Sequence, residues 1–320
     1  MPWVADAPLM PLDRIVGQKV IAAFAGTQPS RSLLHRIRAG QLGGVILFSE
    51  NVASPGQVRT LTARLRHAAR AGGNPPPLIA VDQEGGIVKR LPWAPPSTSA
   101  AAMSQPLAAG RATGRALKAV GITVDLAPVA DVETRPNFLG SRSFDDNEAQ
   151  VARNACAFAH GLNSAGVTPT LKHFPGLGDA SGNTDLERVT ITAPLRLEPY
   201  RRCADHTTLV MFSSATYPRL GPSPAVFERK AHALLDSAVV TVSDDLSSRA
   251  MAGRADVAVR AARAGTDLLL YGGSEATSAG AYRRLVRAVR QHRLGEGRVR
   301  AGVARILALK TGAPPAATNE

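Results

Sequence analysis

Short runs of β-branched and other apolar residues recur along the chain, and each is followed by a polar or glycine-rich turn and then by a helical pattern. Runs of this kind predict buried strands that alternate with amphipathic helices. The strands are expected at residues 20–24, 44–48, 78–82, 122–127, 168–173, 209–212, 239–244 and 267–271. The helical patterns cover residues 56–71, 106–119, 148–164, 246–264 and 277–293.

Eight strands separated by crossovers are typical of a parallel sheet. A doubly wound open sheet is the alternative, but it usually contains fewer strands, and we therefore expect an α/β fold with a single (β/α)8 TIM-type barrel. No shift in composition marks a second domain. We expect the catalytic barrel to span residues 1–312 and residues 313–320 to form a flexible C-terminal tail.

The composition of the 320 residues excludes several classes of protein. Hydrophobic residues make up 44% of the chain, which is enough for a buried core, and no apolar stretch approaches the roughly 18 residues of a membrane span. Residues 1–6 lack the features of a signal peptide and a cysteine for lipidation, so a cytoplasmic location is expected. The two cysteines, Cys156 and Cys203, indicate neither a metal cluster nor a disulfide framework.

The formal net charge of +13 is concentrated late in the chain, where residues 249–310 contain 13 basic and 4 acidic residues. A nucleic-acid-binding surface would interleave its basic residues with aromatic ones, whereas this segment is typical of amphipathic helices with a solvated basic face. We therefore expect neither nucleic acid nor a membrane as a partner, although a positive surface favours anionic ones.

Several strands end in polar residues, at the carboxyl ends where a barrel enzyme keeps its active site. Residues 82–86 follow the third strand, Lys172 and His173 end the fifth, and residues 243–245 end the seventh. The chain lacks zinc-protease spacing, a Walker phosphate loop, a dinucleotide fingerprint and a Gly-x-Ser-x-Gly motif. Carboxylates and basic residues remain, which are the groups that a glycosidase uses, and neither a cofactor nor a metal is implied.

Four ordered motifs closely resemble those of glycoside hydrolase family 3, in particular the single-domain bacterial β-N-acetylglucosaminidases of cell-wall recycling. They are DQEGGIVKR at residues 82–90, LGSRSF at 139–144, KHFPG at 172–176 and VSDDLS at 242–247. The likeness extends from about Asp13 to Leu309. It implies retaining cleavage of a terminal β-linked sugar, with N-acetylglucosamine as the expected sugar, and we expect the protein to be a monomer with a carbohydrate substrate.

The resemblance assigns roles to individual residues. Asp244 matches the nucleophile, which forms a covalent glycosyl-enzyme because a carboxylate stabilises an oxocarbenium-like transition state before bonding to it. The residues that match the sugar-hydroxyl ligands are Asp82, Arg90, Arg142, Lys172 and His173. Structural roles are the alternatives: a helix N-cap for Asp244, an ion pair for the two arginines and a satisfied core histidine for His173.

The loop after residue 176 departs from the family pattern. Relatives place a His after the KHFPG motif and then an Asp-Ser-His whose Asp-His pair is the general acid/base, whereas Leu177, Asn183 and Asp185 stand at these positions here. In one hypothesis Asp185 is itself the acid/base, with its pKa raised under a closed loop. In a second the protein binds a sugar or muropeptide without cleaving it, and in a third it transfers the sugar to phosphate or another sugar. Asp185 also suits a purely structural capping role.

Overall fold

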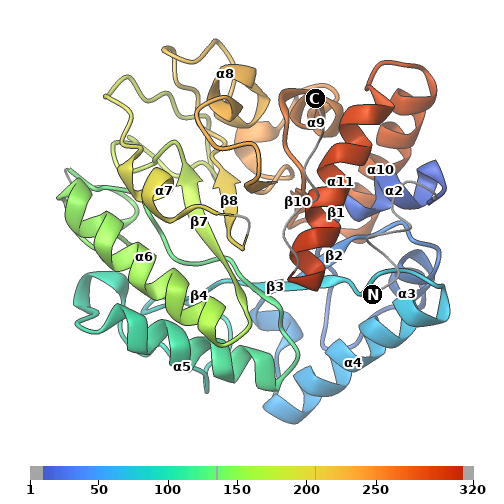
Figure 1. Cartoon of the computed structure of the whole chain (residues 1–320), viewed down its shortest axis with the longest axis horizontal. Coiled ribbons are helices and arrows are strands. Elements are labelled where there is room, and N and C mark those ends of the chain that lie inside the picture. The colour runs from blue at the N-terminus through green and yellow to red at the C-terminus, as the bar shows by residue number, and fades with distance from the viewer. Residues whose placement is uncertain (1–9, 135, 206, 313–320) are drawn as a thin grey trace.

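The computed structural model describes residues 10–134, 136–205 and 207–312, and within them eight parallel strands form a barrel surrounded by helices (Figure 1). The strand order is β10-β1-β2-β3-β6-β7-β8-β9. The barrel closes between β9 and β10, where Ser243 donates its backbone N–H to the Leu268 carbonyl (2.9 Å) and Leu268 donates to Thr241 (2.8 Å). The expected (β/α)8 barrel is confirmed.

All eight expected strands are present, most with shorter bounds. They are β1 (Val20–Ala22), β2 (Gly44–Leu47), β3 (Leu78–Val81), β6 (Val124–Asp125), β7 (Thr168–Phe174), β8 (Leu209–Phe212), β9 (Val240–Ser243) and β10 (Leu269–Tyr271). Nearly all their residues are buried, because one face of the sheet meets the helices and the other fills the barrel. This burial on both faces explains the continuous apolar runs in the sequence.

Four of the five expected helices are confirmed to within three residues, as α4 (Pro55–Ala71), α5 (Pro106–Ala119), α6 (Glu148–Ser164) and α10 (Glu275–Arg290). The helix expected at 246–264 is wrong in its first half, since α9 extends only over Val257–Ala264. Gly253 and Asp256 precede it with φ angles of 72° and 49°, which an α-helix does not accept.

The sequence patterns did not predict five further helices or the short 3-10 turns. The helices are α2 (Leu12–Gln18), α3 (Arg31–Arg38), α7 (Glu198–Cys203), α8 (Arg229–His232) and α11 (Glu296–Thr311). The 3-10 turns are η2 (Ser49–Asn51), η3 (Ala100–Ala102), η4 (Gly140–Arg142), η5 (Ala225–Phe227) and η6 (Arg249–Met251). Most of these elements are shorter than the window over which a helical period is recognisable.

A disulfide joins α6 to α7, because Cys156 and Cys203 are bonded with their Cα atoms 5.2 Å apart. The expectation that these cysteines indicate no disulfide framework is therefore corrected. Their separation of 47 residues says nothing about pairing, since only the packing of α7 on α6 brings the two sulfur atoms together. The bond fixes α7 directly after the loop that carries Asp185.

The last described helix, α11, ends at Thr311, and the tail expected at residues 313–320 lies outside the described residues. Among the helices that the structure describes, none has the length and apolar character required to cross a membrane.

Candidate active site

The carboxyl ends of the strands bring the expected site residues to one face of the barrel. Asp82 directly follows β3, Lys172 and His173 lie near the end of β7, and Asp244 directly follows β9. Barrel enzymes bind their substrates at this face, because the loops that follow the strands converge there. An ion-pair cluster holds Asp82 and Lys172, a separate hydrogen-bonded pair holds His173, and Asp244 bonds to backbone groups.

Lys172 is the centre of a buried ion-pair cluster. Its Nζ lies 2.8 Å from Asp82 Oδ1 and 2.7 Å from Glu84 Oε1. Arg142 donates from Nε and Nη2 to the two Glu84 oxygens, at 2.8 and 2.9 Å. Burial raises the pKa of Glu84, but the cations Lys172 and Arg142 outweigh it and lower that pKa to about 2. In the described part of the chain, no three His, Cys, Asp or Glu side chains are placed to share a metal ion.

Glu84 was not among the predicted site residues, although it lies inside the first motif. It occupies a small hairpin formed by β4 (Gln83–Gly85) and β5 (Val88–Lys89). The turn requires glycine, since Gly85 and Gly86 have φ angles of 96° and 57° and a Cβ on Gly85 would lie 2.2 Å from the Thr98 carbonyl oxygen. An acid beside two glycines at a strand end was the available signal for this residue.

The structure places the two candidate arginines differently. Arg142, on η4, forms the bidentate pair with Glu84, so its ion-pair alternative describes what the side chain does in this structure. Arg90 follows β5, and its guanidinium carbon lies 5.9 Å from the centroid of the Phe48 ring. Its buried Nε–H has no hydrogen-bond partner among the described residues. A buried donor without a partner is suited to a ligand oxygen.

His173 is held in place by Asp131, which the sequence analysis did not identify. The His173 Nδ1 lies 2.7 Å from Asp131 Oδ2, and the His173 backbone N–H donates to Oδ1 at 2.9 Å. The Leu177 backbone N–H and the Tyr200 hydroxyl also donate to Oδ1, at 2.7 and 3.1 Å. Burial raises the pKa of Asp131, but His173 and the Leu177 N–H lower it below its usual value. Because Nδ1 is engaged, Nε2 is the ring nitrogen left for a ligand.

Asp244 is a carboxylate in an environment that disfavours its charge. Burial raises its pKa to about 6, while nearby His173 lowers it and the negative charge of Asp185 raises it further. Its Oδ1 accepts the backbone N–H of Asp245 at 2.9 Å. The next described helical element, the 3-10 turn η6, begins at Arg249 with Ser248 as its N-cap, so the helix N-cap alternative for Asp244 is wrong.

Asp185 lies on the loop between β7 and α7 with an exposed side chain. Its backbone N–H donates to Asn183 Oδ1 at 2.9 Å, and its carbonyl accepts the Arg249 N–H at 3.1 Å. Asn183 therefore stabilises a turn, while Leu177 is buried and bound through its N–H to Asp131. Of the three positions where the loop departs from the family pattern, Asp185 alone carries a titratable group close enough to influence Asp244.

Comparison with curated proteins identifies relatives along most of the chain. Residues 12–309 match the family described as glycosyl hydrolase family 3 N terminal domain. An uncharacterized secreted glycosyl hydrolase of Arthroderma benhamiae is 35% identical over 302 residues, which cover 85% of each protein. Beta-hexosaminidase LpqI of Mycobacterium tuberculosis is 36% identical over 233 residues, which cover 63% of this chain and 60% of that protein.

Solved structures share the same barrel. The glycoside hydrolase family 3 β-N-acetylglucosaminidase from Paenibacillus sp. str. FPU-7 superposes with a TM-score of 0.88 at 31% identity, covering 97% of this chain and 65% of that chain. The β-N-acetylhexosaminidase from Beutenbergia cavernae gives a TM-score of 0.84 at 28% identity, covering 94% and 99%. With the family match extending over residues 12–309, this chain belongs to glycosyl hydrolase family 3.

Proposed function

We propose that this family member is a retaining glycoside hydrolase that removes terminal β-linked sugars, with N-acetylglucosamine as the preferred sugar. The observation that carries the proposal is the position of two carboxylates at the carboxyl end of the barrel: Asp244 directly follows β9, and the Asp185 loop is hydrogen-bonded to Arg249 in the connection after β9. Retaining glycosidases use two such groups, one as the nucleophile and one as the general acid/base. The names of LpqI and of the Paenibacillus and Beutenbergia enzymes support the choice of sugar.

Asp244 is the nucleophile in this proposal. Its carboxylate attacks the anomeric carbon as the glycosidic bond breaks, and a covalent glycosyl-enzyme forms with the leaving group gone. Water then attacks the same carbon and releases the sugar and the carboxylate. Because burial raises the pKa of Asp244 to about 6, the group is ionised yet weakly solvated at neutral pH. Such an anion stabilises an oxocarbenium-like transition state without first losing a hydration shell.

Asp185 is the proposed acid/base. In the first step it donates its proton to the departing glycosidic oxygen, and in the second it removes a proton from the attacking water. Its side chain is exposed in this structure rather than covered by a closed loop as expected, so the role rests on the place of Asp185 in a loop that is hydrogen-bonded to Arg249 after β9. The hydrogen bonds of its backbone with Asn183 and Arg249 hold the residue in place. They do not involve its carboxylate, which has no hydrogen-bond partner among the described residues.

Five charged residues form the proposed sugar-binding rim. They are Asp82, Arg90, Arg142, Lys172 and His173. Glu84 and Asp131 hold three of them in fixed orientations through short ion pairs. Charged groups that are already oriented bind neutral hydroxyls through strong hydrogen bonds without paying for reorganisation. The Arg90 Nε–H, the His173 Nε2 and the third N–H of Lys172 are among the groups with capacity left for a sugar.

The test compares turnover of an aryl β-N-acetylglucosaminide and an aryl β-glucoside by wild type, Asp244→Asn and Asp146→Asn. Asp146 is an exposed aspartate near Arg142 that has no role in the proposal, so its variant controls for the loss of a carboxylate. An activated aryl leaving group needs little protonation, and the assay therefore tests the nucleophile separately from Asp185. We expect turnover to disappear in Asp244→Asn alone and to be faster with the N-acetylglucosaminide.

The role of Asp185 requires a second variant. Asp185→Ala should hydrolyse the aryl substrate slowly because water attacks the glycosyl-enzyme without a base. Azide should accelerate this variant and yield the β-glycosyl azide, because azide is a strong nucleophile that needs no base. Failure of azide to accelerate it contradicts the acid/base role. Acceleration of wild type by phosphate favours the transferase hypothesis, and absence of any turnover by folded wild type favours sugar binding without cleavage.

A cytoplasmic location, a role in cell-wall recycling and a monomeric state stay predictions. Disulfides persist in oxidising compartments, and the bond between Cys156 and Cys203 therefore bears on the first of them. To test the cytoplasmic location, free thiols are blocked with an alkylating reagent in the source cells, and the alkylated cysteines are then counted in the isolated protein. Two free thiols support a reducing cytoplasm, whereas none contradicts that location.

A further inference from the structure

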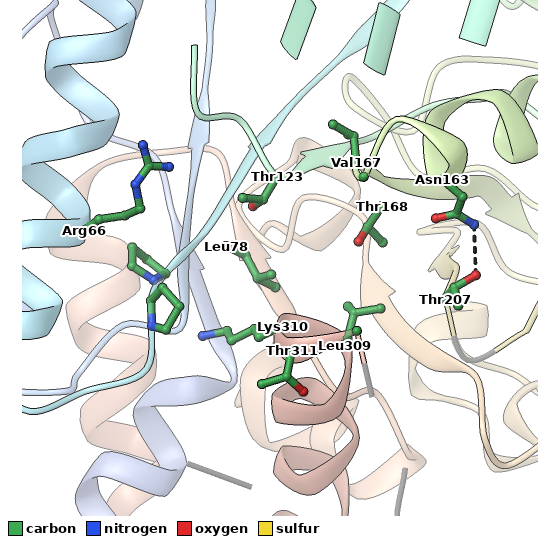
Figure 2. Close-up of a pocket in the computed structure, with 14 residues that line it drawn as sticks. Arg66, Leu78, Thr123, Asn163, Val167, Thr168, Thr207, Leu309, Lys310 and Thr311 are labelled. Carbon is green, nitrogen blue, oxygen red and sulfur yellow. Dashed lines mark hydrogen bonds between the residues drawn. The ribbon is translucent and has the colours of Figure 1, made fainter. Parts of the chain in front are cut away.

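A cavity lies at the opposite end of the barrel from the candidate active site. Its volume of about 430 Å³ falls within the roughly 300–1,000 Å³ of small-molecule sites. It is bounded by the starts of three strands, at Leu78, Thr123 and Thr168, and by the end of α11. Figure 2 shows Lys310 extending from α11 below Leu78 and Thr123, with Arg66 at the far left.

Lys310 is a partly exposed cation with neutral partners. Its Nζ donates to Gln18 Oε1 and to the Gly43 carbonyl, both at 2.8 Å. An ammonium group has three N–H donors, so one remains after these two hydrogen bonds. Burial lowers the pKa of Lys310 to about 7, and no neighbouring charge contributes to this change.

Lys19 is a buried lysine whose ammonium group has an anionic neighbour in the protein, and it provides a comparison for Lys310. Lys19, which packs beneath the same helix, donates to the Thr266 carbonyl at 3.1 Å and lies beside the Asp267 carboxylate. That carboxylate also pairs with Arg305 of α11 at 2.8 Å. Lys19 therefore has an anion within the fold, whereas the acceptors that the described residues offer to Lys310 are neutral.

The other residues that line the cavity indicate which kind of anion would fit beside Lys310. Among the described residues that line it, Arg66 and Lys310 are the charged ones, and none carries a carboxylate. Much of the remaining surface is apolar and comes from Pro76, Pro77, Leu78, Val167 and Leu309. A single accessible ammonium surrounded by apolar walls suits an anion with one charged end and an apolar body.

We propose that this cavity binds a small organic monocarboxylate, with its carboxylate on the Lys310 ammonium and its apolar body against the proline and leucine walls. The site is separate from the proposed glycosidase centre and does not depend on that activity. A bound carboxylate gives the partly buried ammonium a counter-charge that its partners among the described residues do not supply, and the apolar walls strengthen the pair. Binding therefore stabilises the protonated form of Lys310 and takes up protons from solution.

The test is calorimetric titration of the full chain with hexanoate at pH 7.5, in two buffers that differ in ionisation enthalpy. We expect one site and, because the pKa of free Lys310 is about 7, uptake of about three quarters of a proton per hexanoate. Hexanamide, which has the same body without the charge, should bind about tenfold more weakly or worse. Lys310→Met should weaken hexanoate binding by about tenfold or more, and the exposed control Lys230→Met should not.

A labelling experiment on wild type keeps the inference testable if Lys310→Met does not fold. Acetic anhydride acetylates unprotonated amines, and peptide masses report the rate at each lysine. Hexanoate should slow acetylation of Lys310 without slowing that of Lys230. Equal affinity for hexanoate and hexanamide, equal displacement by inorganic phosphate, or absence of binding at millimolar concentration overturns the proposal.

Discussion

Asp244→Asn is expected to abolish hydrolysis and, at neutral pH, to raise the free energy of unfolding. Asparagine has the shape of aspartate, and its side-chain oxygen still accepts the Asp245 N–H that Asp244 Oδ1 accepts at 2.9 Å. The substitution therefore removes little more than a negative charge. Burial disfavours that charge in the folded protein, so its removal relieves a cost that folding otherwise carries.

The magnitude follows from the pKa of Asp244, which burial raises from an ordinary value of 3.8 to about 6. Between these two values the folded protein holds a proton that the unfolded chain has released, so wild-type stability falls as the pH rises and levels off above pH 6. Each pH unit in this window corresponds to about 1.4 kcal/mol, so the ionised carboxylate costs at most about 3 kcal/mol.

Urea unfolding at a series of pH values from 4 to 7.5 measures this cost. The difference in free energy of unfolding between Asp244→Asn and wild type should be close to zero at pH 4. It should grow to at most about 3 kcal/mol above pH 6. The exposed control Asp146→Asn should show no such growth.

Glu84→Gln should change the free energy of unfolding in the opposite direction. Lys172 and Arg142 lower the pKa of Glu84 to about 2 against the effect of burial, so its charge stabilises the fold at any pH above its ordinary value of 4.5. This variant should lose about 3 kcal/mol at neutral pH, and the loss should shrink as the pH falls toward 2. A stability difference between Asp244→Asn and wild type that does not change with pH refutes the reasoning. So does an Asp244→Asn variant that is less stable than wild type at pH 7.5.

Three further outcomes are expected. Because the nucleophile must be ionised, kcat/KM for the aryl substrate should fall about tenfold per pH unit below the pKa of Asp244, near pH 6, and an acid limb near pH 4 contradicts this. Tyr200→Phe removes a donor from buried Asp131 and should lower the free energy of unfolding by about 1.5–3 kcal/mol in urea; no change excludes a stabilising bond. Reduction of the Cys156–Cys203 bond, which spans 47 residues, should lower stability by about 4 kcal/mol, while a double alanine variant should be insensitive to reductant.

Four of the site residues that the sequence predicted lie at or directly after the end of a barrel strand, whereas Arg90, Arg142 and Asp185 lie on the connections. Asp82, Lys172, His173 and Asp244 could be grouped because parallel strands in a barrel end at one face, whatever their separation in the chain. Their partner Glu84 lies at one of these strand ends and was missed, whereas Asp131 lies at no predicted strand end and could not be assigned in this way. The contact of Lys172 with Asp82 spans 90 residues and that of His173 with Asp131 spans 42, and no local pattern encodes either distance.

The sequence by itself determined the number and order of the barrel strands and which strand ends carry polar site residues. Through four motifs it also determined membership in a hydrolase family. These are local properties, since hydrophobic periodicity and motif spacing depend on neighbours along the chain. Only the tertiary structure decided that two cysteines bond, that the surroundings of Asp244 raise its pKa, and that the partners of Lys310 among the described residues are neutral. Electrostatic energies and covalent pairing depend on distance and burial, which are set when segments remote in sequence pack together.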